Sequence, residues 1–132
     1  MSALKITILG CGSSFGVPLF HNIWGKCDPK EPKNIRSRPS ILVQKNGKNL
    51  LIDTSPDLKQ QILSNKIDNI DAVFYTHEHA DHTHGINELR SINLIHRKII
   101  PCYGNEQTME KITHSFNYCL LYTSDAADES RG

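Results

Sequence analysis

The sequence predicts a layered α/β domain, in which helices pack on a β-sheet. Two apolar segments flank Asn46-Gly47, the dipeptide most typical of a two-residue β-hairpin turn. A short apolar run at residues 71–75 is typical of a buried strand. Strand-like and helix-like segments then alternate along the rest of the chain, as in α/β folds. The length of 132 residues allows one domain with its own core and is too short for two.

The N-terminal part is predicted to contain three strands and two loops. Residues 5–9 (KITIL) are β-branched and form the first strand. The following GCGSSFGVP is too rich in glycine and serine to continue a strand. Residues 21–39 hold three prolines and many charges without periodicity, which predicts a long loop. Residues 40–44 and 49–53 form the two strands of the hairpin.

The remainder is predicted to alternate between helix and strand. Ser55-Pro56-Asp57 provides a cap and first turn for a helix at residues 58–63. The later elements are the 71–75 strand, a helix at 85–94, a strand at 98–103 and a helix at 106–118.

Composition excludes several classes of protein. The net charge is +1, with 22% charged and 38% hydrophobic residues, which does not indicate a nucleic-acid partner. No apolar run is long enough to span a bilayer, and the N-terminus lacks the features of a signal peptide. The four cysteines are scattered without a CxxC pair, as expected of free thiols in a reducing compartment. We therefore expect a cytoplasmic protein without a membrane partner.

Residues 76–82 (THEHADH) contain the candidate metal ligands and directly follow a predicted buried strand. Imidazole nitrogens and carboxylate oxygens are the ligands that zinc, iron and manganese take in hydrolytic sites. In an extended segment His77 and His79 point to the same side, so they can bind one metal ion together. Asp81 and His82 are adjacent and diverge unless the chain bends, which suits a second ion beside the first.

Two metal ions a few ångströms apart can share a hydroxide and stabilise both the attacking and the leaving oxygen in hydrolysis. The spacing of the motif therefore predicts a binuclear centre. Isolated histidines are usually surface residues. For that reason no metal role is predicted for the other four, which are His21, His84, His96 and His114.

The segment HEHADH matches the HxHxDH motif of the metallo-β-lactamase superfamily. The resemblance extends to ILGCGSSFGVP, LLIDTSPDL and IPCYGNEQT, and covers residues 4–118. Together these segments resemble the phosphodiesterase branch, which includes cyclic phosphodiesterases of the phosphonate pathway and is similar to the transfer-RNA 3′-processing endonucleases. The resemblance implies the N-terminal half of an αβ/βα sandwich and a metal-dependent phosphodiesterase that uses a hydroxide held by two ions.

The resemblance also implies roles for single residues. His77 and His79 would ligate the first ion and Asp81 and His82 the second, with Asp81 also catalytic. The two divalent ions are expected to be zinc, with manganese or iron as alternatives. The family completes its site with further histidines and a bridging aspartate downstream, which this chain lacks. We therefore expect the 132-residue chain itself to be inactive and to expose an apolar sheet face, unless a homodimer completes the site.

The role of each of the other candidate site residues has two interpretations. Asp53 either supports the metal-binding loop through a hydrogen bond or is a helix N-terminal acid. Ser13 and Ser14 either offer hydroxyl and N–H groups to a phosphate or form a plain turn. Arg36 and Arg38 either clamp a phosphate or are solvated charges.

The substrate is expected to be a small phosphodiester or nucleotide-like molecule. The glycine–serine loop favours this, as does a local excess of positive charge in residues 1–40. That excess comes from Lys5, Lys26, Lys30, Lys33, Arg36 and Arg38 against Asp28 and Glu31. Alternatives are a thioester, lactone or β-lactam hydrolase on the same fold, or a non-catalytic metal-binding fragment.

The last residues differ in character from the rest. After residue 118 the helical pattern breaks, and the sequence becomes rich in small and acidic residues. The segment CLLYTSDAADES resembles an in-frame translation of a transposon-based sequencing adapter, and the alternative is a genuine polar tail. We expect residues 1–118 to be a truncated domain and residues 119–132 to be non-natural and to pack against nothing.

Overall fold

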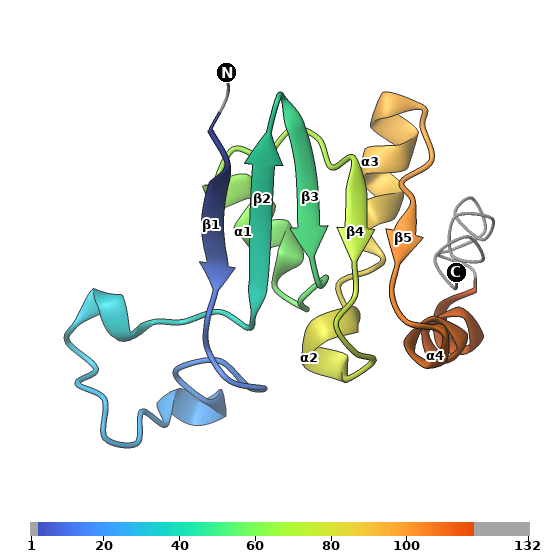
Figure 1. The fold of residues 1–132 in the computed structure, drawn as a ribbon. Helices are drawn as coiled ribbons and strands as arrows, with labels where there is room; N and C mark the ends of the chain where they lie inside the picture. The colour runs from blue at the N-terminus through green and yellow to red at the C-terminus, as the bar shows by residue number, and fades with distance from the viewer. Residues whose placement is uncertain (1–2, 118–132) are drawn as a thin grey trace.

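The structure is a computed structural model of the chain, and it describes residues 3–117 (Figure 1). It is an α/β fold, as predicted, with one five-stranded sheet in the order β1-β2-β3-β4-β5. The strands are β1 (Lys5–Gly10), β2 (Ser40–Lys45), β3 (Lys48–Ile52), β4 (Ala72–Phe74) and β5 (Cys102–Tyr103). The helices are α1 (Leu58–Ser64), α2 (Ala80–Thr83), α3 (Glu88–His96) and α4 (Glu106–Phe116). The prediction for residues 119–132 lies outside the described residues.

The sheet is antiparallel at its N-terminal side and parallel at its C-terminal side. β1, β2 and β3 pair antiparallel, while β3, β4 and β5 pair parallel. The predicted hairpin joins β2 and β3. Its two turn residues, Asn46 and Gly47, have φ values of 54° and 76°, which is the left-handed pair that a type I′ turn requires. The parallel strands end at one edge, and the metal-binding motif follows β4 there (Figure 1).

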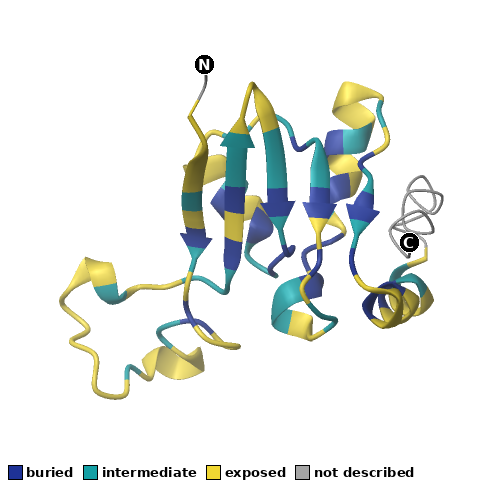
Figure 2. Cartoon of the chain, viewed as in Figure 1, coloured by how far each residue is buried: buried dark blue, intermediate teal, exposed yellow. Residues whose placement is uncertain are grey.

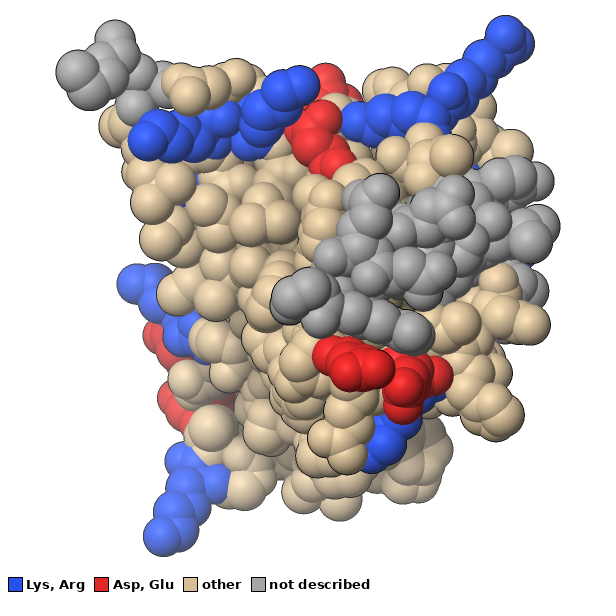
Figure 3. All heavy atoms as spheres, turned by 45° about the vertical axis from the view of Figure 1, so that its right-hand side comes forward, with Lys and Arg blue, Asp and Glu red and all other residues tan. Residues whose placement is uncertain are grey.

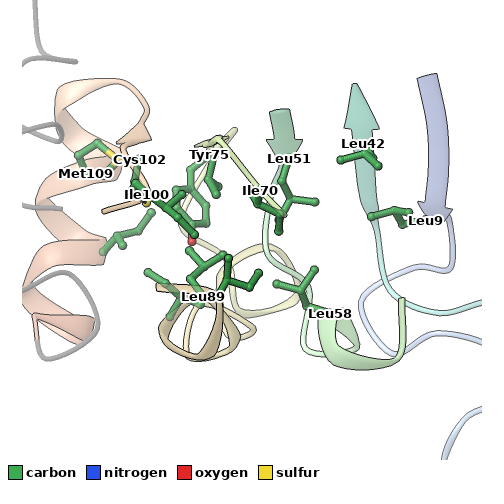
Figure 4. Close-up of a cluster of buried hydrophobic side chains, with 14 residues drawn as sticks. Leu9, Leu42, Leu51, Leu58, Ile70, Tyr75, Leu89, Ile100, Cys102 and Met109 are labelled. Carbon is green, nitrogen blue, oxygen red and sulfur yellow. Dashed lines mark hydrogen bonds between the residues drawn. The ribbon is translucent and has the colours of Figure 1, made fainter. Parts of the chain in front are cut away.

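One face of the sheet builds the core against the helices. A row of side chains, Leu42, Leu51, Val73 and Cys102, runs across four paired strands, and each is at most 2% exposed. Figure 4 shows these strands facing Leu58 of α1 and Leu89 of α3, with Met109 of α4 beside Cys102. Side chains alternate between faces with period two, so the neighbouring rows must point the other way.

Those neighbouring rows are apolar as well, and they are open to solvent (Figure 2). Ile6, Ile8, Ile41 and Phe74 are 60%, 65%, 36% and 42% exposed. Strands that are apolar on both faces are typical of sheets covered on both sides. The described part of the chain covers only one of the two faces of the sheet. The other face exposes a group of neighbouring apolar side chains, whereas most surfaces carry such residues singly.

Most predicted bounds agree with the structure within two residues, but three segments differ more and helix α2 was not predicted. Helix α3 begins at Glu88 rather than at residue 85, because the backbone at Gly85 is pressed against Ser55. The predicted strand at 98–103 forms ladder pairs only at Cys102–Tyr103, since Pro101 before them has no N–H to donate. The 21–39 loop contains two short 3-10 turns, at Phe20–Asn22 and Pro32–Asn34.

The surface charge is mixed. On the face in Figure 3, basic and acidic side chains lie next to one another at several places rather than being gathered by sign. Among the helices described here, none combines the length and the apolar character needed to cross a bilayer.

Candidate metal centre

The metal-binding motif lies at the carboxyl end of β4, where the chain leaves the sheet and turns into α2 (Figure 1). The rings of His77 and His79 lie on the same side, with centroids 4.6 Å apart, as the alternation of an extended segment predicts. The ring of His82 lies 4.1 Å from that of His77. Three imidazoles therefore meet at one edge of the sheet.

Helix α2 supplies the bend that brings Asp81 and His82 together. The Nε2 atom of His82 is 3.2 Å from Oδ2 of Asp81. Two ligand atoms bound to one tetrahedral zinc ion at its usual bond lengths lie about 3.3–3.4 Å apart. The separation observed here thus fits a pair of ligands to a single ion.

Asp53 lies behind the motif and is 4% exposed. Its Oδ1 accepts a hydrogen bond from the Thr76 backbone N–H at 2.8 Å, and its Oδ2 accepts from Thr76 Oγ1 at 2.7 Å. Oδ2 also lies 2.7 Å from Nδ1 of His82. These contacts favour the supporting role for Asp53 over that of a helix N-terminal acid, since the N-cap of α1 is Asp57.

The Asp53 carboxylate assigns the tautomer of His82. An ionised carboxylate only accepts hydrogen bonds, so Nδ1 of His82 must carry the proton. The other ring nitrogen, Nε2, faces Oδ2 of Asp81 at 3.2 Å, and a metal ion bound there would take the place of any proton on it. A carboxylate that accepts from a ligand histidine in this way fixes both its orientation and its basicity.

The hydrogen bonds of Thr76 assign the tautomer of His77 by the same reasoning. The single hydroxyl proton of Thr76 is donated to Asp53, so the 2.9 Å contact between Thr76 Oγ1 and His77 Nδ1 needs its proton from the histidine. In the neutral ring of His77, the lone pair is then on Nε2. The Asp53 carboxylate thus orients two histidines, His82 directly and His77 through Thr76. Sequence reasoning missed Thr76 because a threonine is not itself a typical metal ligand.

Glu78 points away from this group. Its carboxylate lies 3.1 Å from Nζ of Lys111 on α4. Hydrogen bonds from its own backbone N–H and then from Lys111 hold the pKa of Glu78 below its usual value. An ionised glutamate paired with α4 leaves the ligand set to the histidines and Asp81.

The rings of the motif lie close together, with His82 nearer to His77 than His79 is. Within residues 3–117, however, no three side chains of His, Cys, Asp or Glu come together in an arrangement that would hold one ion. The chemistry of the donors suits a divalent ion such as zinc, iron or manganese.

The glycine-rich loop after β1 is held by backbone packing. A Cβ atom at Gly12 would lie 2.8 Å from the carbonyl oxygen of Arg36, and the Gly12 N–H donates to Ser37 O. Ser13 and Ser14 are exposed on this loop. The hydrogen bonds described for residues 3–117 do not join these two serines to the histidines, so their phosphate-binding role stays a prediction.

The two loop arginines have protein partners. Arg36 donates to Sγ of Cys11 at 3.4 Å. Arg38 forms a two-pronged pair with Asp57 through Nε at 2.9 Å and Nη2 at 2.7 Å. Arg38 therefore ties the loop to the start of α1, and a phosphate would have to compete with a carboxylate for it.

The pair between Arg38 and Asp57 predicts a pH-dependent stability. The hydrogen bond from Arg38 holds the pKa of Asp57 below its ordinary value of 3.8. A lowered pKa contributes stability above the ordinary value, and this contribution is lost as pH falls through the lowered one. Asp57→Asn should cost about 1 kcal/mol of unfolding free energy at pH 7, because the pair is partly solvated. The difference from the wild type should shrink below pH 3.8.

Urea unfolding at a series of pH values measures the difference in unfolding free energy between Asp57→Asn and the wild type. Asp68→Asn is the control because Asp68 is an exposed aspartate. A cost that stays constant down to pH 2 would contradict the assignment.

Comparison with known proteins identifies the family. The profile of the "Beta-lactamase superfamily domain" matches residues 48–129, which is more than half of the chain. The chain belongs to the β-lactamase superfamily. The resemblance noted from the HxHxDH segment is thereby confirmed, as is the α/β fold class.

Individual known proteins are also similar to this chain. A crystal structure of a diphosphatase from the PhnP family is 38% identical, with a TM-score of 0.78, over 92% of this chain and 49% of that one. An octanoyltransferase of Porphyromonas gingivalis is 37% identical over 87% of this chain and 23% of its own length. A ribonuclease Z of Methanopyrus kandleri is 34% identical over 55% and 27%. The chain thus spans about half of the diphosphatase and about a quarter of the two sequence relatives.

Proposed function

We propose that this chain contributes the first half of a binuclear metal centre to a phosphodiesterase. His77 and His79 would hold one divalent ion, and Asp81 and His82 the other, with zinc favoured over manganese or iron. The observation that carries the proposal is the Asp53 carboxylate, which prepares His82 directly and His77 through Thr76.

The residues have separate tasks in this proposal. The histidines would bind the ions through ring nitrogens, while Asp81 adds negative charge beside His82. The buried Asp53 keeps both rings in place. Bound divalent ions would supply Lewis acidity and a nucleophilic water at neutral pH. Loop donors near Ser13 and Ser14 would neutralise charge that develops on a phosphate.

A phosphodiester substrate is favoured by two of the three relatives named above, whereas the name of the octanoyltransferase denotes acyl transfer. One is a diphosphatase and another a ribonuclease Z, and both names denote cleavage at phosphorus. The net positive charge of residues 26–38, between β1 and β2, agrees with an anionic substrate. We infer a small phosphodiester or nucleotide-like molecule rather than a thioester or lactone.

Hydrolysis of bis(p-nitrophenyl) phosphate tests the proposal. A longer protein that contains residues 3–117 should show turnover that a chelator abolishes and zinc or manganese restores. The 132-residue chain should bind zinc weakly and show no turnover, because its described residues offer two ligands per ion. Chelator-insensitive turnover, or a preference for thioester or lactone substrates in the longer protein, would refute the phosphodiesterase assignment.

A further inference from the structure

A buried hydroxyl lies directly beneath the metal-binding motif. Thr54 follows Asp53 and is 0% exposed. Its Oγ1 lies 3.1 Å from the carbonyl oxygen of Thr83 and 2.9 Å from the Tyr75 hydroxyl. Its backbone N–H donates to His82 O at 2.9 Å, and its carbonyl accepts from Gly85 N–H at 3.0 Å. Apart from the contact with Tyr75, these hydrogen bonds join Thr54 to residues 82–85, which include or follow the candidate metal ligands.

The direction of these hydrogen bonds can be assigned. A carbonyl oxygen only accepts, so the single hydroxyl proton of Thr54 goes to Thr83 O. The Tyr75 hydroxyl then donates to Thr54 Oγ1. Tyr75 is also 0% exposed, so both hydroxyls are shielded from water. Removing the Thr54 hydroxyl would take an acceptor from the buried Tyr75 hydroxyl and one of two donors from Thr83 O, which keeps the Ile86 N–H at 3.0 Å.

Helix α2 depends on such outside support. It has four residues, Ala80–Thr83, and an isolated helix this short is not stable by itself. It nevertheless carries Asp81 and His82. The Thr83 hydroxyl binds the carbonyl oxygens of Glu78 and His79, which closes the loop on itself but does not attach it to the sheet. Thr54 makes that attachment.

The close approach at Gly85 shows how tightly the loop is seated. A Cβ atom there would lie 1.8 Å from the carbonyl oxygen of Ser55. The backbone of residues 54–55 and that of residues 82–85 are therefore in direct contact. Asp53 orients the ring of His82, while Thr54 sets the backbone from which that ring extends.

We propose that Thr54 is a positioning residue that sets the affinity of the His82 and Asp81 pair for a divalent ion, through hydrogen bonds to the α2 loop and without touching the ion. The inference rests on the proposed metal centre. Loss of a residue that supports metal ligands from outside typically costs about 10–100-fold in metal affinity. Thr54→Val removes the hydroxyl at nearly constant shape, whereas Thr54→Ser retains it.

The test compares metal affinity with loop mobility in the 132-residue protein. Zinc and cobalt affinities are measured by competition with a chromogenic chelator, and hydrogen exchange of residues 78–85 is followed by mass spectrometry without metal. We expect Thr54→Val to weaken zinc binding about tenfold and to speed exchange, with Thr54→Ser within about twofold of the wild type. Tyr75→Phe should have a smaller effect of the same sign. Thr108→Val, at another buried threonine, should leave both readings unchanged.

The outcomes separate this inference from the proposed function. Wild-type protein that binds no metal would refute the proposed centre, while the exchange measurement would still test the attachment by Thr54. Unchanged affinity and exchange in Thr54→Val would overturn the positioning role. So would equal losses in Thr54→Ser and Thr54→Val that follow their melting temperatures, since a purely structural role predicts that result.

Discussion

His79→Ala is expected to remove zinc binding at the His77 pair and to abolish metal-dependent turnover in a longer protein that contains this chain. The substitution leaves one histidine where two rings lie 4.6 Å apart on the same side of the motif. The affinity should fall by more than about a hundredfold, since losing a ligand costs more than losing its outer partner. The ion contributes several kcal/mol of charge stabilisation, so the rate should fall by about a thousandfold.

The measurements are zinc competition for the 132-residue chain and phosphodiester hydrolysis for the longer protein. His96→Ala is the control, because His96 is an exposed histidine whose Nε2 contacts the Asp68 carbonyl instead of the motif. Since His79 is exposed, its removal should leave the unfolding free energy nearly unchanged. Zinc affinity equal to that of the wild type would show that His79 is not a ligand.

Asp53→Ala is expected to destabilise the fold and to weaken metal binding together. Two donor groups of Thr76 and Nδ1 of His82 lose their charged acceptor, and a hydrogen bond to a charged group contributes about 1.5–3 kcal/mol. Asp53 also has φ of 64°, a left-handed conformation that aspartate tolerates better than alanine. The unfolding free energy should therefore fall by about 3 kcal/mol or more.

Asp53→Asn separates the two effects. Asparagine accepts the left-handed backbone and retains one acceptor oxygen, so stability should fall less than in Asp53→Ala. It no longer offers two carboxylate oxygens to Thr76 and His82, so zinc affinity should still fall about 10–100-fold. Urea unfolding without metal and zinc competition measure the two quantities. Wild-type stability in Asp53→Ala would rule out the supporting role.

Much of the sheet followed from local sequence. The Asn46-Gly47 turn specified the hairpin because only a pair of left-handed residues matches the twist of the strands. Residues 41–43 and 50–52 are apolar throughout, so the sequence predicted two strands but not that Leu42 and Leu51 face the core. The start of α3 and the length of β5 were wrong, because the contact of Gly85 with Ser55 and the effect of Pro101 on strand pairing depend on neighbouring segments.

For the candidate site, the sequence by itself determined the pairing of His77 with His79, since period two in an extended chain is a property of the backbone. Only the tertiary structure decided that Asp81 and His82 converge, because the bend of α2 is held by Thr54 from another segment. It also decided that Asp53 faces His82, which lies 29 positions away. Hydrogen bonds between distant segments depend on how the strands are placed side by side, and no local pattern encodes that placement.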